Sequence, residues 1–483
     1  MKQGLNSKCS KSRILEVSNV SGAAEVTEIG MSDSATGVVD MTEGPVTGHI
    51  LRFALPMLLG YLFQQFYSMV DTIIVGKYLG VHALAGVGST GAISFMIIGF
   101  CTGICAGFCI PVAQCFGAGD HVKMRKYIAN AAWISAAFAV VLTVMVCALT
   151  GRILHIMDTQ PDIYDFAYDY IFIVFAGIPA TILYNLASSI IRSLGDSKTP
   201  VYFLLLSSAV NIVLDLVTIA VFGMGVEGAA YATVFSQLVS GILCTVYMYK
   251  KFAIIHFSGS EASVDGKCIK RLVLMGVPMG LQYTITAVGS VILQTAVNGL
   301  GYMAVAAVTA GSKIRLFFCT PYDALGGTMA TFAGQNAGAM KPERVKEGVI
   351  KATVIGFIYS AAGIVLMLIL GDLLCGLFVD GNETVIISMA KYFLIVDACF
   401  GFFLTMVNVY RFAMQGMGYS GFAMIAGILE MIGRSAVAFA LVPVMGFTAA
   451  CYAAPLAWIF ADIFLVPACL KCISKLRSGY VNV

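Results

Sequence analysis

Residues 51–80 read LRFALPMLLGYLFQQFYSMVDTIIVGKYLG, an apolar stretch long enough to cross a membrane. It nevertheless contains Pro56, Gln64, Tyr67 and Asp71. The last three are spaced i, i+3, i+7 and therefore share one face of a helix. Pro56 lacks a backbone N–H, so we expect a bend there. Because a carboxylate in lipid costs about 2.5–3.5 kcal/mol, Asp71 is predicted to face protein or a water-filled cavity and to have a function.

The composition indicates a membrane protein with many spans. Of the 483 residues, 59% are hydrophobic and 11% are charged, against about 25% charged residues in soluble domains. The net charge is only +3 and the basic residues are scattered over short loops, which excludes an extended surface for nucleic acid. The 14 cysteines lie mostly inside apolar runs and are interpreted as small apolar side chains.

Hydropathy divides the chain into two sets of six spans. Residues 1–45 are polar and are predicted to form a disordered cytosolic tail. A spanning length of about 20 residues then defines twelve segments: 51–76, 86–113, 128–150, 166–190, 201–222, 228–249, 273–298, 304–333, 351–370, 388–413, 422–443 and 448–470. We expect an all-α membrane protein with a first six-helix lobe at 46–250, a cytosolic linker at 251–272, a second six-helix lobe at 273–470 and a cytosolic tail at 471–483.

Charges in the loops predict the orientation. Every second loop is basic, with Lys or Arg at 123, 125, 126, 192, 198, 250, 251, 267, 270, 271, 341, 344 and 346, and the C-terminal segment is basic at 471, 475 and 477. Cytoplasmic loops are enriched in Lys and Arg. We therefore expect a multi-pass protein of the plasma membrane with both termini in the cytoplasm.

The two sets of six spans repeat each other in sequence. ALPMLLGYLFQQ resembles GVPMGLQYTITA and aligns Pro56 with Pro278, while PVAQCFGAGD resembles TFAGQNAGAM and aligns Gly117 with Gly338. Two further pairs of segments align at almost the same separation, which composition alone does not explain. Because six spans return the chain to its starting side, the lobes are expected to be related by an axis along the membrane normal, with a substrate path between them.

The carboxylates of the first lobe have no acidic counterparts in the second. In the fifth span, Asn211 and Asp215 are spaced i, i+4 and share a face, and Thr233 in the sixth span adds a hydroxyl. Together with Asp71 these groups predict a cation or proton site, because two buried carboxylates repel each other unless a proton or cation relieves them. The alternative is that the acids cap backbone groups or pair with basic residues. Gln64 and Tyr67 either adjoin this site or satisfy their neighbours.

The second lobe mixes acids and bases. Span eight contains Lys313, Arg315 and Asp323, span ten contains Asp397, and span eleven contains Glu430 and Arg434. Glu430 and Arg434, at i, i+4, are predicted to form an internal ion pair. Lys313 lies in an apolar run, so it must pair with an acid or face the cavity.

No enzyme motif is present. GAGDHVKMRK lacks the spacing of a phosphate-binding loop, and the sequence contains no HExxH or GxSxG motif. We therefore expect no catalytic activity and no cofactor.

Over residues 46–472 the chain resembles the multidrug and toxic compound extrusion (MATE) family of secondary transporters. The segments that carry the resemblance are LPMLLGYLFQQFYSMVDTIIVGKYLG, VAQCFGAGD, IIRSLGDSKTP, NIVLDLVTIAVFGMGVEGAAYAT, LMGVPMGLQ and GQNAGA. The resemblance implies two six-helix lobes around a central cavity. It also implies export of amphipathic, often cationic, organic compounds in exchange for H⁺ or Na⁺.

By match to the family, the first lobe would hold the coupling ion. The resemblance assigns this site, including a possible Na⁺, to Asp71, Asn211, Asp215 and Thr233, with Gln64 and Tyr67 beside it, and it places the first-helix proline at Pro56. Some branches also use acids in the seventh and tenth spans. Residues 272–297 contain no carboxylate, so second-lobe coupling would need Asp397 or Glu430 instead.

The mechanism expected from these residues is alternating access by a monomer in the lipid bilayer. H⁺ or Na⁺ entering from outside would neutralise Asp71 and Asp215 and change the bend at Pro56. The main alternative is a flippase for a lipid-linked saccharide, which needs a wide cationic cavity; Lys313, Arg315, Arg411 and Arg434 keep it open. A membrane-embedded enzyme and a channel are disfavoured, since no clustered catalytic motif or repeated selectivity filter is found.

Overall fold

The computed structural model describes residues 39–257, 259, 261–379 and 382–479, and within these ranges the chain is helical and contains no strand. Among the described residues, ten helices are long and apolar enough to cross a membrane. Two more spans arise if each bent helix pair counts as one: α5 (Pro161–Ala176) with α6 (Ile178–Ser193), bent by 47°, and α12 (Thr384–Cys399) with α13 (Gly401–Gly416), bent by 50°. The predicted all-α membrane fold is confirmed.

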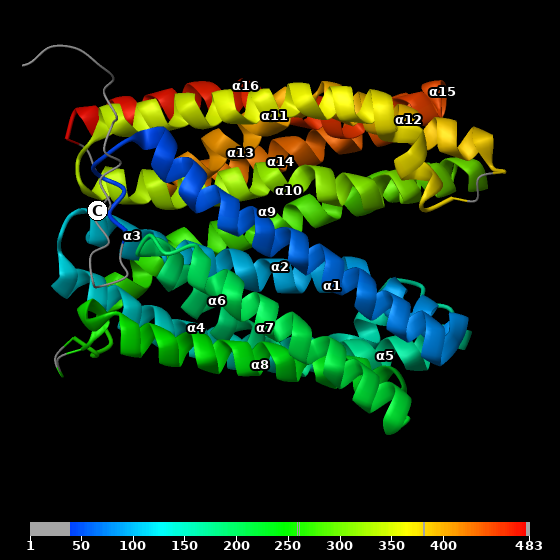
Figure 1. Ribbon diagram of the computed structural model, residues 1–483, viewed down its shortest axis with the longest axis horizontal. Coiled ribbons are helices and arrows are strands. Elements are labelled where there is room, and N and C mark those ends of the chain that lie inside the picture. Colours follow the sequence, from blue (N-terminus) through cyan, green and yellow to red (C-terminus); the bar gives the residue numbers. More distant parts are fainter. Residues whose placement is uncertain (1–38, 258, 260, 380–381, 480–483) are drawn as a thin grey trace, which may run out of the picture. The chain divides into compact units, whose positions relative to one another are not determined.

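The helices form two halves, which Figure 1 shows as a lower group in cyan and green and an upper group in yellow and red. The first half contains α1 (Val46–Ser89), α2 (Gly91–Phe108), α3 (Ile110–Gly117), α4 (His121–Ile156), α5, α6, α7 (Lys198–Asp215) and α8 (Gly225–Lys251). The second half contains α9 (Gly266–Asn298), α10 (Tyr302–Gly338), α11 (Pro342–Gly376), α12, α13, α14 (Ser420–Ala436), α15 (Val442–Met445) and α16 (Phe447–Arg477).

Several helices extend beyond the predicted spans. α16 continues to Arg477, so residues 471–477 of the predicted C-terminal tail are helical, with Lys475 and Arg477 in the last turn, where cations favour a helix end. α9 begins at Gly266, inside the predicted linker. Within α1 the residue with non-helical backbone angles is Gly80, whereas Pro56 lies in continuous helix. The bend at Pro56 stays a prediction.

The repeat seen in the sequence extends to irregularities of the backbone. The break between α5 and α6 lies at Gly177, and the break between α12 and α13 lies at the equivalent position of the repeat, Phe400. Both halves also contain a π-helix in the corresponding span, at Leu216–Val221 and at Val437–Leu441. The two halves therefore share local geometry as well as sequence.

The first helix of each half begins against the core of the other half. The early turns of α1, including Phe53 and Met57, pack in the same core as Phe332 and Trp458 of the second half. The later turns of α1 pack against residues of the first half that include Ile219 and Val226. In return, Cys268 and Leu272 at the start of α9 belong to the core of the first half. Each half is thus anchored to the other by a crossing helix.

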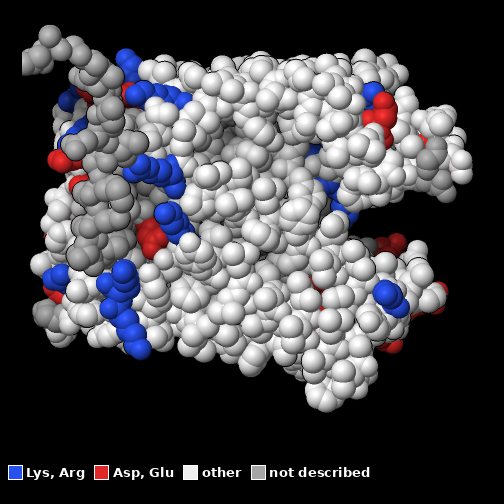
Figure 2. Space-filling view, in the orientation of Figure 1, with Lys and Arg blue, Asp and Glu red and all other residues white. Residues whose placement is uncertain are grey.

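The two ends of this helix assembly differ. Lys and Arg side chains gather at the end where α1 begins and α16 ends, which we call the basic end (Figures 1 and 2). At the opposite end, Figure 2 shows a hollow between the two halves. The structure therefore has a form that is closed at the basic end and open at the other.

Two glutamines related by the repeat join the halves at the basic end. Gln114 of α3 donates from Nε2 to the carbonyl of Gly416 in the second half, at 2.9 Å. Gln335 of α10, its counterpart in the repeat, donates from Nε2 to the carbonyl of Ser193 in the first half, at 3.0 Å. Because each side chain bonds a buried carbonyl of the other half, opening this end leaves both carbonyls without these donors.

Residues 39–44, which we call the N-terminal strap, also connect the two halves. The amide of Val39 donates to the carbonyl of Leu194 in the first half, at 3.2 Å. The amide of Met41 donates to Oε1 of Gln335 in the second half, at 2.9 Å. The Met41 carbonyl accepts from Nε and Nη2 of Arg344, at 3.1 and 3.0 Å.

The prediction of a disordered tail up to residue 45 is therefore wrong for residues 39–45. Their low hydropathy indicated disorder, but their backbone groups meet donors and acceptors supplied by distant helices. Residues 1–38 of the predicted tail lie outside the described residues.

Removing the Arg344 guanidinium is expected to loosen the strap. Hydrogen bonds to charged groups stabilise by about 1.5–3 kcal/mol each, so Arg344→Gln should lower the thermal midpoint of the purified protein measurably. Lys346→Gln is the matched control, because Lys346 carries the same charge on the same helix, is exposed and makes none of these bonds. Equal midpoints for the two variants would show that Arg344 does not hold the strap.

Candidate functional site

The two first-half acids come together between α1 and α7. Asp71 lies on α1 and is partly buried, and Asp215 ends α7 with a fully buried side chain. Their carboxyl groups lie within hydrogen-bonding reach of each other. Neither oxygen of Asp215, nor Oδ1 of Asp71, receives a hydrogen bond from another described residue. Two ionised carboxylates at this separation repel, and a proton shared between them, or a bound cation, would supply the missing partner.

Asn211 and Thr233 lie beside this pair. Asn211 is 1% exposed and precedes Asp215 by one helical turn. Its Nδ2 donates to Oγ1 of Thr233 on α8, at 3.4 Å, and its Oδ1 has no partner among the described residues. The structure thus gathers carboxylate, amide and hydroxyl oxygens from α1, α7 and α8. Oxygen is the ligand that hard cations prefer, and the carboxylates also accept protons.

A π-helix directly follows the buried acid. The chain changes from α-helix to π-helix at Leu216, immediately after Asp215. π-helical turns are rare and are often found at functional sites. The second half has the same turn at Val437–Leu441, but Ala436 stands where the first half has Asp215. Both halves therefore contain the π-helical turn, but only the first half has an acid directly before it.

Of the two residues predicted to adjoin the site, Tyr67 lies near the acids and Gln64 is exposed. The Tyr67 hydroxyl lies near Asp71 and Asp215, whereas Gln64 is exposed and makes no hydrogen bond among those found for the described residues. Tyr170 on α5 also lies near both acids. The sequence analysis missed Tyr170, because its proximity depends on how α5 packs against α1.

The predicted second-half residues form buried ion pairs. Glu430 and Arg434 pair at 3.6 Å, as expected from their spacing, and Arg411 of α13 also pairs with Glu430. Asp397 pairs with Arg315 at 3.1 Å. Asp397, Glu430 and Arg434 are at most 7% exposed. These groups therefore neutralise one another inside the second half.

Asp462 of α16 is a buried acid that the sequence analysis overlooked. It is 5% exposed, and neither carboxylate oxygen has a hydrogen-bond partner among the described residues. The signal was available, since Asp462 lies within an apolar span and the argument applied to Asp71 applies to it equally.

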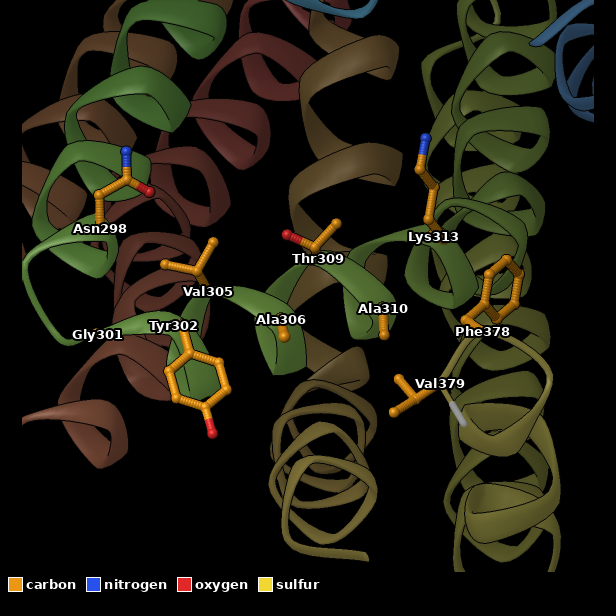
Figure 3. Close-up of a pocket in the computed structure, with 10 residues that line it drawn as sticks. All are labelled: Asn298, Gly301, Tyr302, Val305, Ala306, Thr309, Ala310, Lys313, Phe378 and Val379. Atoms are coloured by element: carbon orange, nitrogen blue, oxygen red, sulfur yellow. The ribbon is translucent and has the colours of Figure 1, made fainter. Parts of the chain in front are cut away.

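Lys313 lines a cavity of about 750 Å³ in the second half. Figure 3 shows it with Asn298 and Tyr302, at the turn from α9 to α10, and with Phe378 and Val379, which follow α11. Lys313 is exposed and has no ion pair among the described residues. All residues that line this cavity belong to the second half, so a place for Lys313 in the cavity between the lobes stays a prediction.

The chain was compared with known proteins. The family model MatE matches residues 56–217 and 278–440, and the two matches begin at Pro56 and Pro278, the prolines that the internal repeat aligns. A relative is the probable multidrug resistance protein YoeA of Bacillus subtilis (strain 168), 28% identical over 343 residues, covering 70% of this chain and 74% of the relative. Another, the FAD transporter of Shewanella oneidensis, is 21% identical and covers 78% and 85% of the two chains.

The fold also matches solved structures. The crystal structure of MATE in complex with MaL6 superposes with a TM-score of 0.85 and 22% sequence identity, covering 91% of this chain and 99% of that one. The two family matches, each lying in one half, account for most of the membrane-spanning chain. The chain is a multi-pass membrane protein and belongs to the MatE family, the multidrug and toxic compound extrusion transporters that its sequence resembles.

Proposed function

We propose that the protein is a cation-coupled antiporter that exports amphipathic, often cationic, organic compounds by alternating access. The observation that carries the proposal is the Asp71–Asp215 carboxyl pair, in which the Asp215 oxygens and Oδ1 of Asp71 accept no hydrogen bond from other described residues. A group that binds H⁺ or Na⁺ reversibly must be stable in both states, and a close carboxyl pair gains a partner when the ion binds.

Alternating access is supported by the difference between the two ends. The halves are bonded at the basic end through Gln114 and Gln335 and are separated by a hollow at the other end. If the basic end is cytoplasmic, as its charge predicts, this form is open to the outside. α1 contacts both halves and carries Asp71. Ion binding at Asp71 is therefore placed to change how the halves meet.

The relatives support the substrate class. The relative from Bacillus subtilis is named a probable multidrug resistance protein, whereas the Shewanella oneidensis relative is named an FAD transporter, which suggests that anionic substrates also occur among similar proteins. In this chain Arg315, Arg411 and Arg434 are paired with acids. A flippase or a carrier of polyanions needs several free basic groups in its cavity. Of the four basic residues considered for that role, three are paired with acids and Lys313 alone has no ion pair among the described residues, so this pairing favours the export of cations.

Transport in proteoliposomes tests the proposal. Protein reconstituted in one orientation should transport ethidium when a gradient of either H⁺ or Na⁺ is imposed across the membrane. The gradient that drives this transport identifies the coupling ion. We expect a rate about tenfold above that of liposomes without a gradient. Absence of gradient-driven movement for every dye in a panel of organic cations would contradict the proposed function.

A further inference from the structure

One acid in the middle of α10 stands apart from the ion pairs described above. Asp323 has an exposed side chain, although its neighbours Tyr322 and Ala324 are each only 1% exposed. It makes no hydrogen bond or ion pair with any described residue. Because α10 runs from Tyr302 to Gly338, Asp323 is several turns away from both helix ends.

The surroundings of Asp323 come from both halves. Tyr61 of α1 and Tyr283 of α9 lie near its carboxylate, and so does Arg411 of α13. A side chain directed at lipid would have apolar chains as neighbours. Exposure among polar groups from α1, α9 and α13 instead indicates that Asp323 faces a water-accessible space between the halves.

Aromatic rings from both halves border the same helix. Phe66 of α1 and Phe317 of α10 pack with ring centroids 5.3 Å apart and planes inclined by 58°. Phe66 is 51% exposed although it lies within the spanning part of α1. Faces of Phe and Tyr attract organic cations through the ring quadrupole. Phe317 precedes Asp323 by six residues on α10, so aromatic surface and a carboxylate occur within two turns of the same helix, a combination that suits an amphipathic cation better than a small metal ion.

The arginines near Asp323 form their ion pairs with other acids. Arg411 pairs with Glu430, which also pairs with Arg434, and Arg315 pairs with Asp397. Arg315 also lies over the ring of Trp458, 5.5 Å from its centroid. The guanidinium groups nearest to Asp323 are therefore paired with other acids, and none of them forms an ion pair with Asp323 in the described part of the chain.

We propose that Asp323 binds the positive charge of the transported organic cation, with Tyr61 and Tyr283 beside it and the Phe66–Phe317 pair contributing aromatic surface. This assignment rests on the proposed function and adds the part of the site that selects the substrate. Asp71 and Asp215, in the first half, would hold the coupling ion, while Asp323, in the second half, holds the substrate. The two cations then occupy different acids.

Equilibrium binding of radiolabelled tetraphenylphosphonium to the purified full-length protein tests the assignment. Asp323→Asn keeps the side-chain size and removes the charge, and it should raise the Kd about tenfold or more. Asp323→Glu restores the charge and should bind within a few-fold of wild type. Asp372→Asn is the matched control, because it removes an acid of the same half that pairs with Lys391 at the surface, and its Kd should stay within about twofold of wild type.

The outcomes separate the two proposals. Binding by wild type that is unchanged in Asp323→Asn would overturn the assignment and leave the proposed function standing. Failure of wild type to bind or transport any organic cation would overturn both. If Asp323→Asn does not give monodisperse protein, Asp323→Ser provides the second neutral variant, and the same two results decide.

Discussion

Asp215→Asn is expected to abolish ion-driven transport, reducing the rate about tenfold or more, because the variant cannot exchange a proton or a cation charge at this position. Asp215 is fully buried and lies beside Asp71, so an amide at position 215 can donate a hydrogen bond to Asp71 without a bound proton or cation. The carboxylate of Asp71 would then have a hydrogen-bond donor without binding an ion. The measurement is dye movement in proteoliposomes under the gradient that drives the wild-type protein.

Substrate exchange distinguishes lost coupling from lost folding. Exchange of labelled for unlabelled substrate without an ion gradient should persist in Asp215→Asn if the variant is folded and only uncoupled. Glu227→Gln is the matched control, since Glu227 is an exposed acid of the same half, at the start of α8, and its loss should leave gradient-driven transport near wild type. Full gradient-driven transport by Asp215→Asn would refute the coupling role.

The partner residue extends this test. Asp71→Asn should reproduce the loss, and the double variant should be no worse than either single variant, because residues that act as a unit give non-additive effects. Additive losses in the double variant would mean that the two carboxyl groups act separately. That result would contradict the shared site.

The cost of burying charge explains why part of this site was predictable. Asp71 and Asp215 stood out because an acid in an apolar span needs a reason, and Asn211 followed from its spacing on the same helix face. The two acids lie together because α1 packs against α7, and this packing cannot be predicted from a local sequence pattern. Tyr170 was missed for the same reason. Asp462 could have been predicted in the same way, because it is also an acid within an apolar span.

For the fold, too, local features could be predicted from the sequence, whereas contacts between distant residues could not. Hydropathy and the repeat predict twelve spans, because the length of an apolar segment is a local property. The breaks at Gly177 and Phe400 fall inside spans that read as continuous. The strap could not be predicted either, because its partners, including Leu194, Gln335 and Arg344, lie far away along the chain. The contacts between the halves could not be predicted, because they are formed by residues that are distant in the sequence.

Gly117→Ala is expected to force apart the closed basic end. A Cβ atom on Gly117, at the end of α3, would lie 1.9 Å from the carbonyl oxygen of Gln335. A Cβ on Gly338, at the end of α10, would lie 1.9 Å from the carbonyl oxygen of Gln114. Both obstacles are backbone atoms, which cannot rotate away as a side chain can. Overpacking in a close-packed core costs about 1–3 kcal/mol or more, so separating α3 from α10 is the available relief.

Hydrogen–deuterium exchange measures this separation at the helix ends. Gly117→Ala should increase exchange in residues 110–118 and also in residues 332–340, since the two segments protect each other. Gly338→Ala should give the same pattern, because the two glycines are equivalent in the repeat and face each other's neighbours. Gly421→Ala, on α14, is the matched control, since a Cβ there meets nothing within 4 Å.

The combination of the two substitutions decides whether this contact acts as one closure. If Gly117→Ala already separates the helices, adding Gly338→Ala should increase exchange little further, because the contact that the second methyl group would disturb is gone. Independent, additive increases would mean that each glycine serves only its own helix. Exchange like that of Gly421→Ala in either single variant would contradict the closure. A less-than-additive response would identify the α3–α10 crossing as the place where the two halves part when the basic end opens.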